Sequence, residues 1–317
     1  MHAKLHIIVP TFNNESTILA TIESLLNQTY KDLFIWIIND GSTDNTLLVL
    51  EQFESNKRVK VITKSNGGAG EARNLGIQKA KQNGAEYIGF CDADDFAHPQ
   101  KFEIQMSVMS SSPNTDVVVT GEKYVASNYE PNCLPFYDVN TIKHNVISNL
   151  FEMLCNKNFN YHPASSLIRA RLFSESARFT NHTCGEDYWL HLYLAAKDSV
   201  FRRVENEMYF SRQFENSLQR SPGASYYDGL ARFSAINKLL SDEYNITNES
   251  KRLVLQEAND RFLRWHVSGA RIVYPYTGSL VVCLKNFNNF NSKTLALIEL
   301  SKSIINPIVR IVKQSRI

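Results

Sequence analysis

The sequence predicts an α/β fold with a mostly parallel sheet, helices on both of its faces, and a smaller helical region at the C-terminal end. Through about residue 121, short apolar runs alternate with segments of helical periodicity, which is the pattern of βαβ units. These runs are apolar without alternation, as in strands that are buried on both faces. From about residue 221, amphipathic helical segments follow one another instead.

The strands and helices of the first 121 residues can be placed in order. The apolar run over 4–9 stops at Pro10, and residues 16–26 carry apolar side chains at the spacing of a helix. The next apolar run ends at an Asn39-Asp40-Gly41 turn. Continued in the same way, the sequence predicts strands over 33–38, 59–63, 87–91 and 116–121, and helices over 44–53, 71–83 and 102–109.

Beyond residue 121 the pattern is less regular. The sequence predicts a strand over 165–169, a helix that includes Trp189, and helices over 143–155, 229–240, 250–267 and 292–312. We therefore expect one domain over 1–220, with halves of about 1–121 and 122–220, and a helical region over 221–317.

Composition narrows the function classes. Lys and Arg number 34 and Asp and Glu number 32, so the net charge of +2 gives no sign of the basic stripe of a nucleic-acid binder. The five cysteines include no C-x-x-C pair, so we expect reduced thiols. No apolar stretch approaches the roughly 20 residues of a membrane-spanning helix, and the N-terminal run is too short for a signal peptide. We expect a cytoplasmic protein.

Polar side chains follow the predicted strands, at the sheet edge where ligands bind in such folds. The sharpest segment is Asp92-Ala93-Asp94-Asp95. On an extended chain Asp92 and Asp94 point the same way, and two hard oxygen ligands suit Mn²⁺ or Mg²⁺. Mg²⁺ held by so few carboxylates takes other ligands from water and substrate phosphates, so the pair predicts a phosphate-bearing substrate. The alternative is a solvated acidic turn in which Asp95 caps a helix.

Two more strand ends carry candidate binding residues. Asp40 accepts hydrogen bonds from a base or ribose, or it belongs to an ordinary Asp-Gly turn. Gly68 lies in a glycine-rich loop that opens a helix, and Arg73 either faces a nucleotide or pairs with Glu71 or Asp92. The first βα turn has no glycine and no P-loop motif occurs, so dinucleotide and P-loop chemistry are not predicted.

Glu186 and Asp187 lie near the start of the helical segment that includes Trp189. A carboxylate at a helix N-terminus is stabilised by about 0.3–1 kcal/mol, which is a sufficient structural explanation. The functional alternative is a general base beside an acceptor hydroxyl. His162 precedes the strand over 165–169 and could border an acceptor site, although a lone histidine there is more often structural.

Taken in order, six segments resemble the inverting nucleotide-sugar glycosyltransferases of family 2, which have the GT-A fold. The resemblance covers about residues 1–215 and points to bacterial members that build capsule or lipopolysaccharide chains. Asn39 is a departure, since many relatives carry a second acid there. The matching segments are residues 7–14, 24–30, 39–44, 66–74, 92–95 and 185–187.

The resemblance implies a role for each matching residue. Asp94, with Asp92, holds the Mn²⁺ or Mg²⁺ that bridges the diphosphate of the donor. Asp187 is the general base that deprotonates the acceptor hydroxyl, and Glu186 positions it. Residues 1–121 then form the nucleotide-sugar half and residues 122–220 the acceptor half. The residues implied to line the donor pocket are Pro10, Thr11, Phe12, Asn13, Asp40, Gly68, Arg73, Asp92, Ala93 and Arg212.

The implied reaction moves a sugar, with inversion, from a nucleotide-diphosphate donor to a hydroxyl of a growing surface glycan or lipid-linked acceptor. UDP is the expected carrier. The basic, partly apolar stretch over 295–317 suits a peripheral helix on the inner face of the cell membrane, a helix packed on its own domain, or contact with a second subunit in a homo-oligomer.

Two other functions stay open from the sequence. A sugar nucleotidyltransferase shares a sheet with acidic strand ends and a metal, although its glycine-rich, basic first loop is missing from residues 10–14. A catalytically silent nucleotide-binding protein retains the fold without turnover. The release of nucleoside diphosphate, of pyrophosphate or of neither distinguishes the three.

Overall fold

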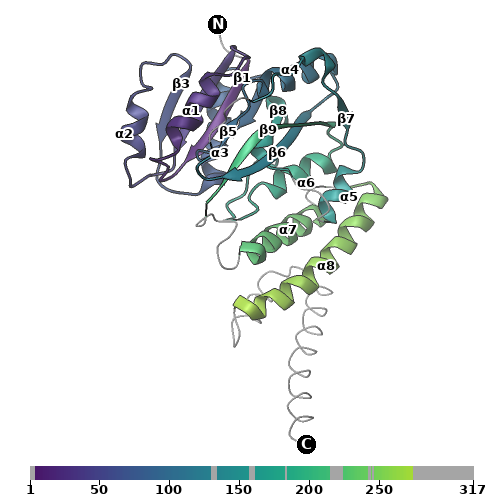
Figure 1. The fold of residues 1–317 in the computed structure, drawn as a ribbon. Helices are drawn as coiled ribbons and strands as arrows, with labels where there is room; N and C mark the ends of the chain where they lie inside the picture. Colours follow the sequence, from purple (N-terminus) through teal and green to yellow (C-terminus); the bar gives the residue numbers. More distant parts are fainter. Residues whose placement is uncertain are drawn as a thin grey trace, which may run out of the picture. The chain divides into compact units, whose positions relative to one another are not determined.

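The computed structural model describes residues 4–129, 134–156, 161–182, 184–214, 224–241, 244 and 246–273. The chain divides into two compact units, Met1–Ser217 and Leu218–Ile317. This division lies close to the boundary expected near residue 220. Figure 1 draws the sheet with its helices in the first unit and two long helices in the second.

Nine described strands of the first unit form one sheet, in the order β3-β2-β1-β4-β8-β6-β9-β5, with β7 beside β9. Strands β1 to β4 are parallel to their neighbours within that group. Strand β8 is antiparallel to both β4 and β6, so the sheet is mixed rather than mostly parallel. The strands are β1 (Leu5–Thr11), β2 (Leu33–Asn39), β3 (Val59–Thr63), β4 (Tyr87–Phe90), β5 (Phe96–Ala97), β6 (Val117–Ala126), β7 (His144–Val146), β8 (Ser166–Arg169) and β9 (Phe201–Gln213).

The core lies where helices cover this sheet. All seven residues of β1 are buried, as its uninterrupted apolar run requires. Helix α3 (Ala69–Gln82) comes so close to the sheet that a Cβ added at Gly76 would lie 2.5 Å from Cγ2 of Ile8. The other described helices of this unit are α1 (Ile18–Leu26), α2 (Thr46–Glu51), α4 (Lys101–Ser111), α5 (Leu150–Cys155) and α6 (Tyr188–Ala196).

Two expectations for the less regular half were wrong. The helix expected over 143–155 begins only at Leu150, because Asn149 has a left-handed φ of 58° and His144–Val146 pairs with β9. The longest strand, β9, was not predicted at all. It runs beside β6 along the length of that strand, and this pairing extends β6 to Ala126, past the expected end at residue 121.

The second unit contains helices α7 (Ala224–Leu240) and α8 (Glu249–Val273), which pack against each other. Their buried side chains include Phe233, Ile236 and Leu255. The helix expected over 292–312 lies outside the described residues. Within the described part of the chain, the helices are too short or too polar to cross a membrane.

Candidate active site

The Asp40 carboxylate organises the glycine-rich loop at the carboxyl end of β2. Its oxygens accept hydrogen bonds from the backbone N–H groups of Gly67 at 3.0 Å and Gly68 at 2.7 Å. Lys64 Nζ lies 2.6 Å from Oδ1. Asp40 is 3% exposed, so a buried carboxylate links the end of β2 to this loop. Sequence reasoning missed Lys64.

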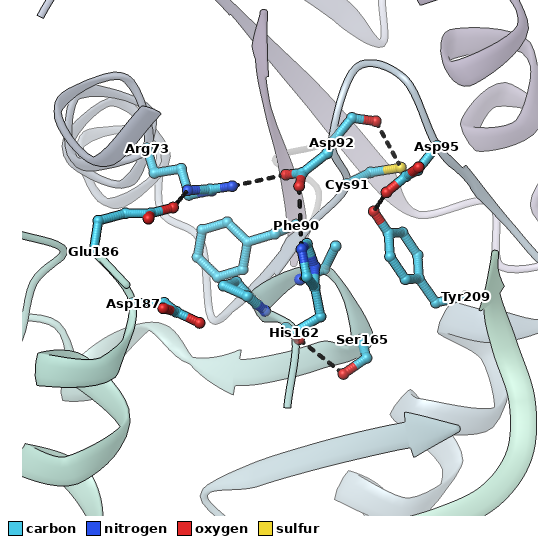
Figure 2. A network of polar contacts seen from close by, with 12 residues as sticks. Arg73, Phe90, Cys91, Asp92, Asp95, His162, Ser165, Glu186, Asp187 and Tyr209 are labelled. Carbon is cyan, nitrogen blue, oxygen red and sulfur yellow. Dashed lines mark hydrogen bonds and ion pairs between the residues drawn. The ribbon is translucent and has the colours of Figure 1, made fainter. Parts of the chain in front are cut away.

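Arg73 joins two acidic segments that are far apart in the sequence. From α3 its guanidinium donates to Asp92 Oδ1 at 2.8 Å and to Glu186 Oε1 at 2.6 Å. Figure 2 shows Arg73 between these two carboxylates. The pairing with Asp92, one of the alternatives from the sequence, is therefore observed, and the partner Glu186 was not foreseen. The arginine is 3% exposed, and its guanidinium carbon lies 5.3 Å from the centre of the Phe179 ring.

His162 is the second residue that contacts the Asp92 carboxylate. Its Nε2 lies 3.4 Å from Asp92 Oδ2, and its ring stacks on that of Tyr209. Burial lowers the pKa of His162, but the charges of Asp92 and Glu122 raise it above its usual value. Burial raises the pKa of Asp92, but Arg73 and His162 bring it below its usual value. Arg73 and His162 therefore both favour the charged form of Asp92.

Asp94 and Asp95 differ in their surroundings. Burial and the charge of Asp92 raise the pKa of Asp94 to about 6. Among the described residues, none forms an ion pair with the Asp94 carboxylate. Asp95 does not cap a helix: its carboxylate accepts hydrogen bonds from the hydroxyl of Tyr209 and from the backbone N–H of Arg212 at 2.7 Å. Asp95 thus ties the acidic segment to β9.

Asp187 lies at the start of α6, beside Glu186. Its side chain makes no capping hydrogen bond to the helix. Its Oδ2 lies 3.8 Å from Nδ1 of the buried His191. Figure 2 shows the Asp187 carboxylate below that of Glu186. The Arg73 bridge to Glu186 therefore brings the expected base to the acidic edge.

The remaining expected donor residues lie around this edge. Thr11 and Asn39 end the paired strands β1 and β2, and Phe12 is 46% exposed next to them. Asn13 has a left-handed φ of 55° and accepts a hydrogen bond from the N–H of Thr43. Pro10 is buried in β1 and Ala93 is buried between the acids.

Arg212 reaches the acidic segment from β9. Its Nη1 donates to the backbone oxygen of Asp94 at 3.0 Å, and its guanidinium carbon lies 4.9 Å from the centre of the Phe96 ring. The position is partly exposed. Arg212 therefore places a positive charge beside Asp94.

The donor set at Asp94 fits a hard divalent cation only in part. Asp92 and Asp94 are oxygen ligands of the right kind, but Asp92 is already paired with Arg73 and His162. Within the residues described, no group of three His, Cys, Asp or Glu side chains could enclose a metal. A cation here would therefore depend on substrate phosphates and water for its other ligands, as Mg²⁺ commonly does.

Residues 6–176 match the family model of Glycosyl transferase family 2. The chain belongs to this family. A glycosyltransferase of Streptococcus pneumoniae, GlyG, is 29% identical over 234 residues, which are 70% of this chain and 74% of that one. The chondroitin synthase of Pasteurella multocida is 41% identical over 99 residues, 31% of this chain and 10% of that one. Some relatives are much longer: an uncharacterized glycosyltransferase of Rickettsia bellii, 36% identical over 110 residues (35% of this chain), is covered over only 16% of its length.

Solved structures confirm the GT-A type of fold for this family member. Staphylococcus aureus TarS 1–349 in complex with UDP-GlcNAc superimposes with a TM-score of 0.63 at 19% identity, covering 94% of this chain and 80% of that one. The mannosyltransferase PcManGT from Pyrobaculum calidifontis, in complex with GDP-Man and Mn²⁺, gives a TM-score of 0.54 at 14% identity, covering 96% and 81%. At these identities the likeness shows the fold alone.

Proposed function

We propose that this chain is a metal-assisted, inverting glycosyltransferase that takes its sugar from a nucleoside-diphosphate donor. One observation carries the proposal: Arg73 bridges Asp92 and Glu186 within hydrogen-bonding distance. The bridge joins the strand-end acids of the donor half to the segment that holds Asp187. Family membership and the UDP, UDP-GlcNAc and GDP-Man complexes of similar folds support a nucleotide-sugar donor.

The residues of the chain divide the work of an in-line displacement. Asp187 takes the proton of the acceptor hydroxyl, whose oxygen then forms the new bond to the anomeric carbon. The bond between that carbon and the diphosphate oxygen breaks on the opposite face, so the configuration inverts. Glu186, fixed by Arg73, orients the segment of Asp187. Asp94, with Asp92, would hold the Mn²⁺ or Mg²⁺, which supplies Lewis-acid stabilisation of the departing diphosphate.

Donor and acceptor remain proposals at the level of chemical class. We expect UDP as the carrier, with Thr11, Phe12, Asp40 and Arg73 near the base, and a glycan or lipid-linked hydroxyl as acceptor. Reaction at the cytoplasmic face of a membrane suits such an acceptor. The domain limits of 1–220 and 221–317 belong to the same proposal.

The test is a panel of nucleotide sugars with Mn²⁺ or Mg²⁺, in which release of the nucleoside diphosphate is measured. We expect Asp94→Asn and Asp187→Asn to lower kcat by at least about 100-fold, the scale of a lost general base. Asp32→Asn is the matched control, because Asp32 is exposed and precedes β2, at the opposite end of that strand. Full activity in both Asp94→Asn and Asp187→Asn would contradict the assignment.

The same assay separates the alternatives. Release of pyrophosphate would indicate a nucleotidyltransferase. Binding of UDP without turnover of any donor and acceptor pair would indicate a silent family member.

A further inference from the structure

Lys101 is a buried cation that the proposed reaction does not use. It is the first residue of α4, and its side chain is fully buried. None of the described carboxylates pairs with it. Its ammonium instead donates to the backbone oxygen of Ala164 and, at 3.3 Å, to that of Phe90. The rings of Phe102 and Tyr209 form its walls, with centroids 4.4 Å and 5.4 Å from Nζ.

Stability does not explain a lysine at this position. A buried ammonium loses its hydration, and two carbonyl dipoles restore only part of it, whereas an apolar side chain of similar length would fill the same space without that penalty. The penalty is visible in the pKa of Lys101, which burial lowers to about 8. The side chain is therefore still charged near neutral pH.

The two carbonyls that Lys101 binds belong to the two segments that meet at the site. Phe90 ends β4, two residues before Asp92. Ala164 lies in the short helical turn Pro163–Ser165, two residues after His162. Lys101 thus fixes the backbones that present the Asp92–His162 pair, which Figure 2 shows beside Phe90.

The charge of Lys101 acts on the same acids. Its ammonium lies on the backbone oxygen of Phe90, two residues before Asp92. A fixed positive charge on the segment that leads into Asp92 reduces the mutual repulsion of Asp92, Asp94 and Asp95 when no cation is bound. It also opposes a divalent cation at Asp94, because the two positive charges repel each other through a medium of low dielectric.

We propose that Lys101 is a positioning residue, a built-in counter-cation that holds Asp92 against His162 and weakens the hold of the acidic edge on its divalent ion. The inference rests on the proposed function, because it needs a cation and a diphosphate at Asp94. A weaker hold favours release of the metal with the nucleoside diphosphate after transfer.

The test uses the full chain and the variant Lys101→Met, which keeps the length of the side chain and removes its charge and donors. Equilibrium binding of Mn²⁺ is measured in the presence of UDP, alongside kcat, KM for the donor and the Tm of the metal-free protein. We expect about tenfold tighter Mn²⁺ binding, a kcat at least tenfold lower with a smaller change in KM, and a Tm that does not fall. Lys60→Met, at an exposed position of β3, should match the wild type.

A second variant separates charge from hydrogen bonding. Lys101→Gln keeps an N–H donor for the carbonyls, so it should bind Mn²⁺ more tightly, like Lys101→Met, but retain more of kcat. It also keeps the test valid if Lys101→Met does not fold.

Weaker or unchanged Mn²⁺ binding in both variants, with a lowered Tm, would show a merely structural lysine and overturn the inference. An unchanged kcat in Lys101→Met would overturn it as well. A wild-type chain that does not bind Mn²⁺ with UDP and does not turn over any donor would overturn the proposed function. A variant that matches an active wild type would overturn only the inference about Lys101.

Discussion

Arg73 and Arg171 each hold a carboxylate oxygen at 2.6 Å, yet their surroundings differ. The Arg73 side chain is 4% exposed, whereas that of Arg171, which pairs with Asp116, is 65% exposed. Removal of one partner from a buried pair leaves an uncompensated charge, while an exposed pair contributes little. Burial, and not distance, should therefore decide the effect of each arginine.

We expect Arg73→Met to lower the free energy of unfolding by about 3–5 kcal/mol and Arg171→Met by no more than about 1 kcal/mol. Denaturation in urea measures both values. Arg73→Met should also abolish release of the nucleoside diphosphate. Similar losses of stability in the two variants would contradict this account of the bridge.

At the residue scale, the sequence indicated the acids better than their partners. Asp40, Asp92 and Asp187 were selected as candidates because each follows a strand or precedes a helix at the predicted ligand-binding edge. Lys64, Tyr209 and Lys101 were missed. Their contacts depend on how distant segments pack, and a lysine or tyrosine within an ordinary helix or strand pattern gives no signal of that packing.

The segment between β5 and α4 includes His98, whose two ring nitrogens both have partners. Nδ1 accepts from the backbone N–H of Gln100, and Nε2 contacts the backbone oxygen of Pro135. This arrangement needs a neutral ring with its proton on Nε2, since a proton on Nδ1 would remove the acceptor. Burial accordingly lowers the pKa of His98 below its usual value.

The contacts of His98 predict that the protein loses stability in acid. The unfolded chain protonates His98 near pH 6.5, but the folded chain does so only at lower pH. The contribution of the neutral His98 ring to the free energy of unfolding is therefore complete above pH 6.5 and is lost as the pH falls below it. We expect the free energy of unfolding to fall less between pH 7.5 and 5.5 in His98→Gln than in the wild type. Urea denaturation at the two pH values measures this change. The same change in the free energy of unfolding in the wild type and in His98→Gln would exclude this role.

Helix α3 meets the segment around Thr180 at Gly70. A Cβ at this position would lie 2.0 Å from the backbone oxygen of Thr180, whose N–H donates to the backbone oxygen of Glu186. We expect Gly70→Ala to cost about 1–3 kcal/mol of stability and to lower kcat, because the segment of Glu186 must shift. Gln78→Ala, at an exposed position of the same helix, is the control, and a fully active Gly70→Ala would show that the segment is free to adjust.

At the element scale, the sequence predicted the parallel strands and missed β9. Strands β1 to β4 are short apolar runs that only buried strands explain. Strand β9 instead carries Arg202, Arg203, Glu205 and Glu207, and its buried and exposed residues do not alternate regularly. Its pairing with β6 contains irregularities of register around Gly121, which disturb the two-residue period. No local pattern could therefore have identified it.

At the scale of the whole molecule, every residue assigned to the site lies within the unit Met1–Ser217. We expect residues 1–217 expressed alone to unfold cooperatively and to bind UDP with Mn²⁺ as the full chain does, since this unit has its own core. Urea denaturation and thermal shift with the ligand measure the two properties. Loss of nucleotide binding in the fragment would show that the second unit contributes to the site.

The hydrogen bonds of Asp40 have a consequence for ligand entry. Its two oxygens already accept hydrogen bonds from two backbone N–H groups and an ammonium, so an incoming base has to compete with these donors. A ligand that donates to Asp40 must displace one of these donors or move the glycine loop aside. It gains only the difference in free energy between the old and the new hydrogen bonds. Selectivity at this position should then depend on whether the ligand donates a hydrogen bond as strong as the one it displaces. An apolar ring has no such donor.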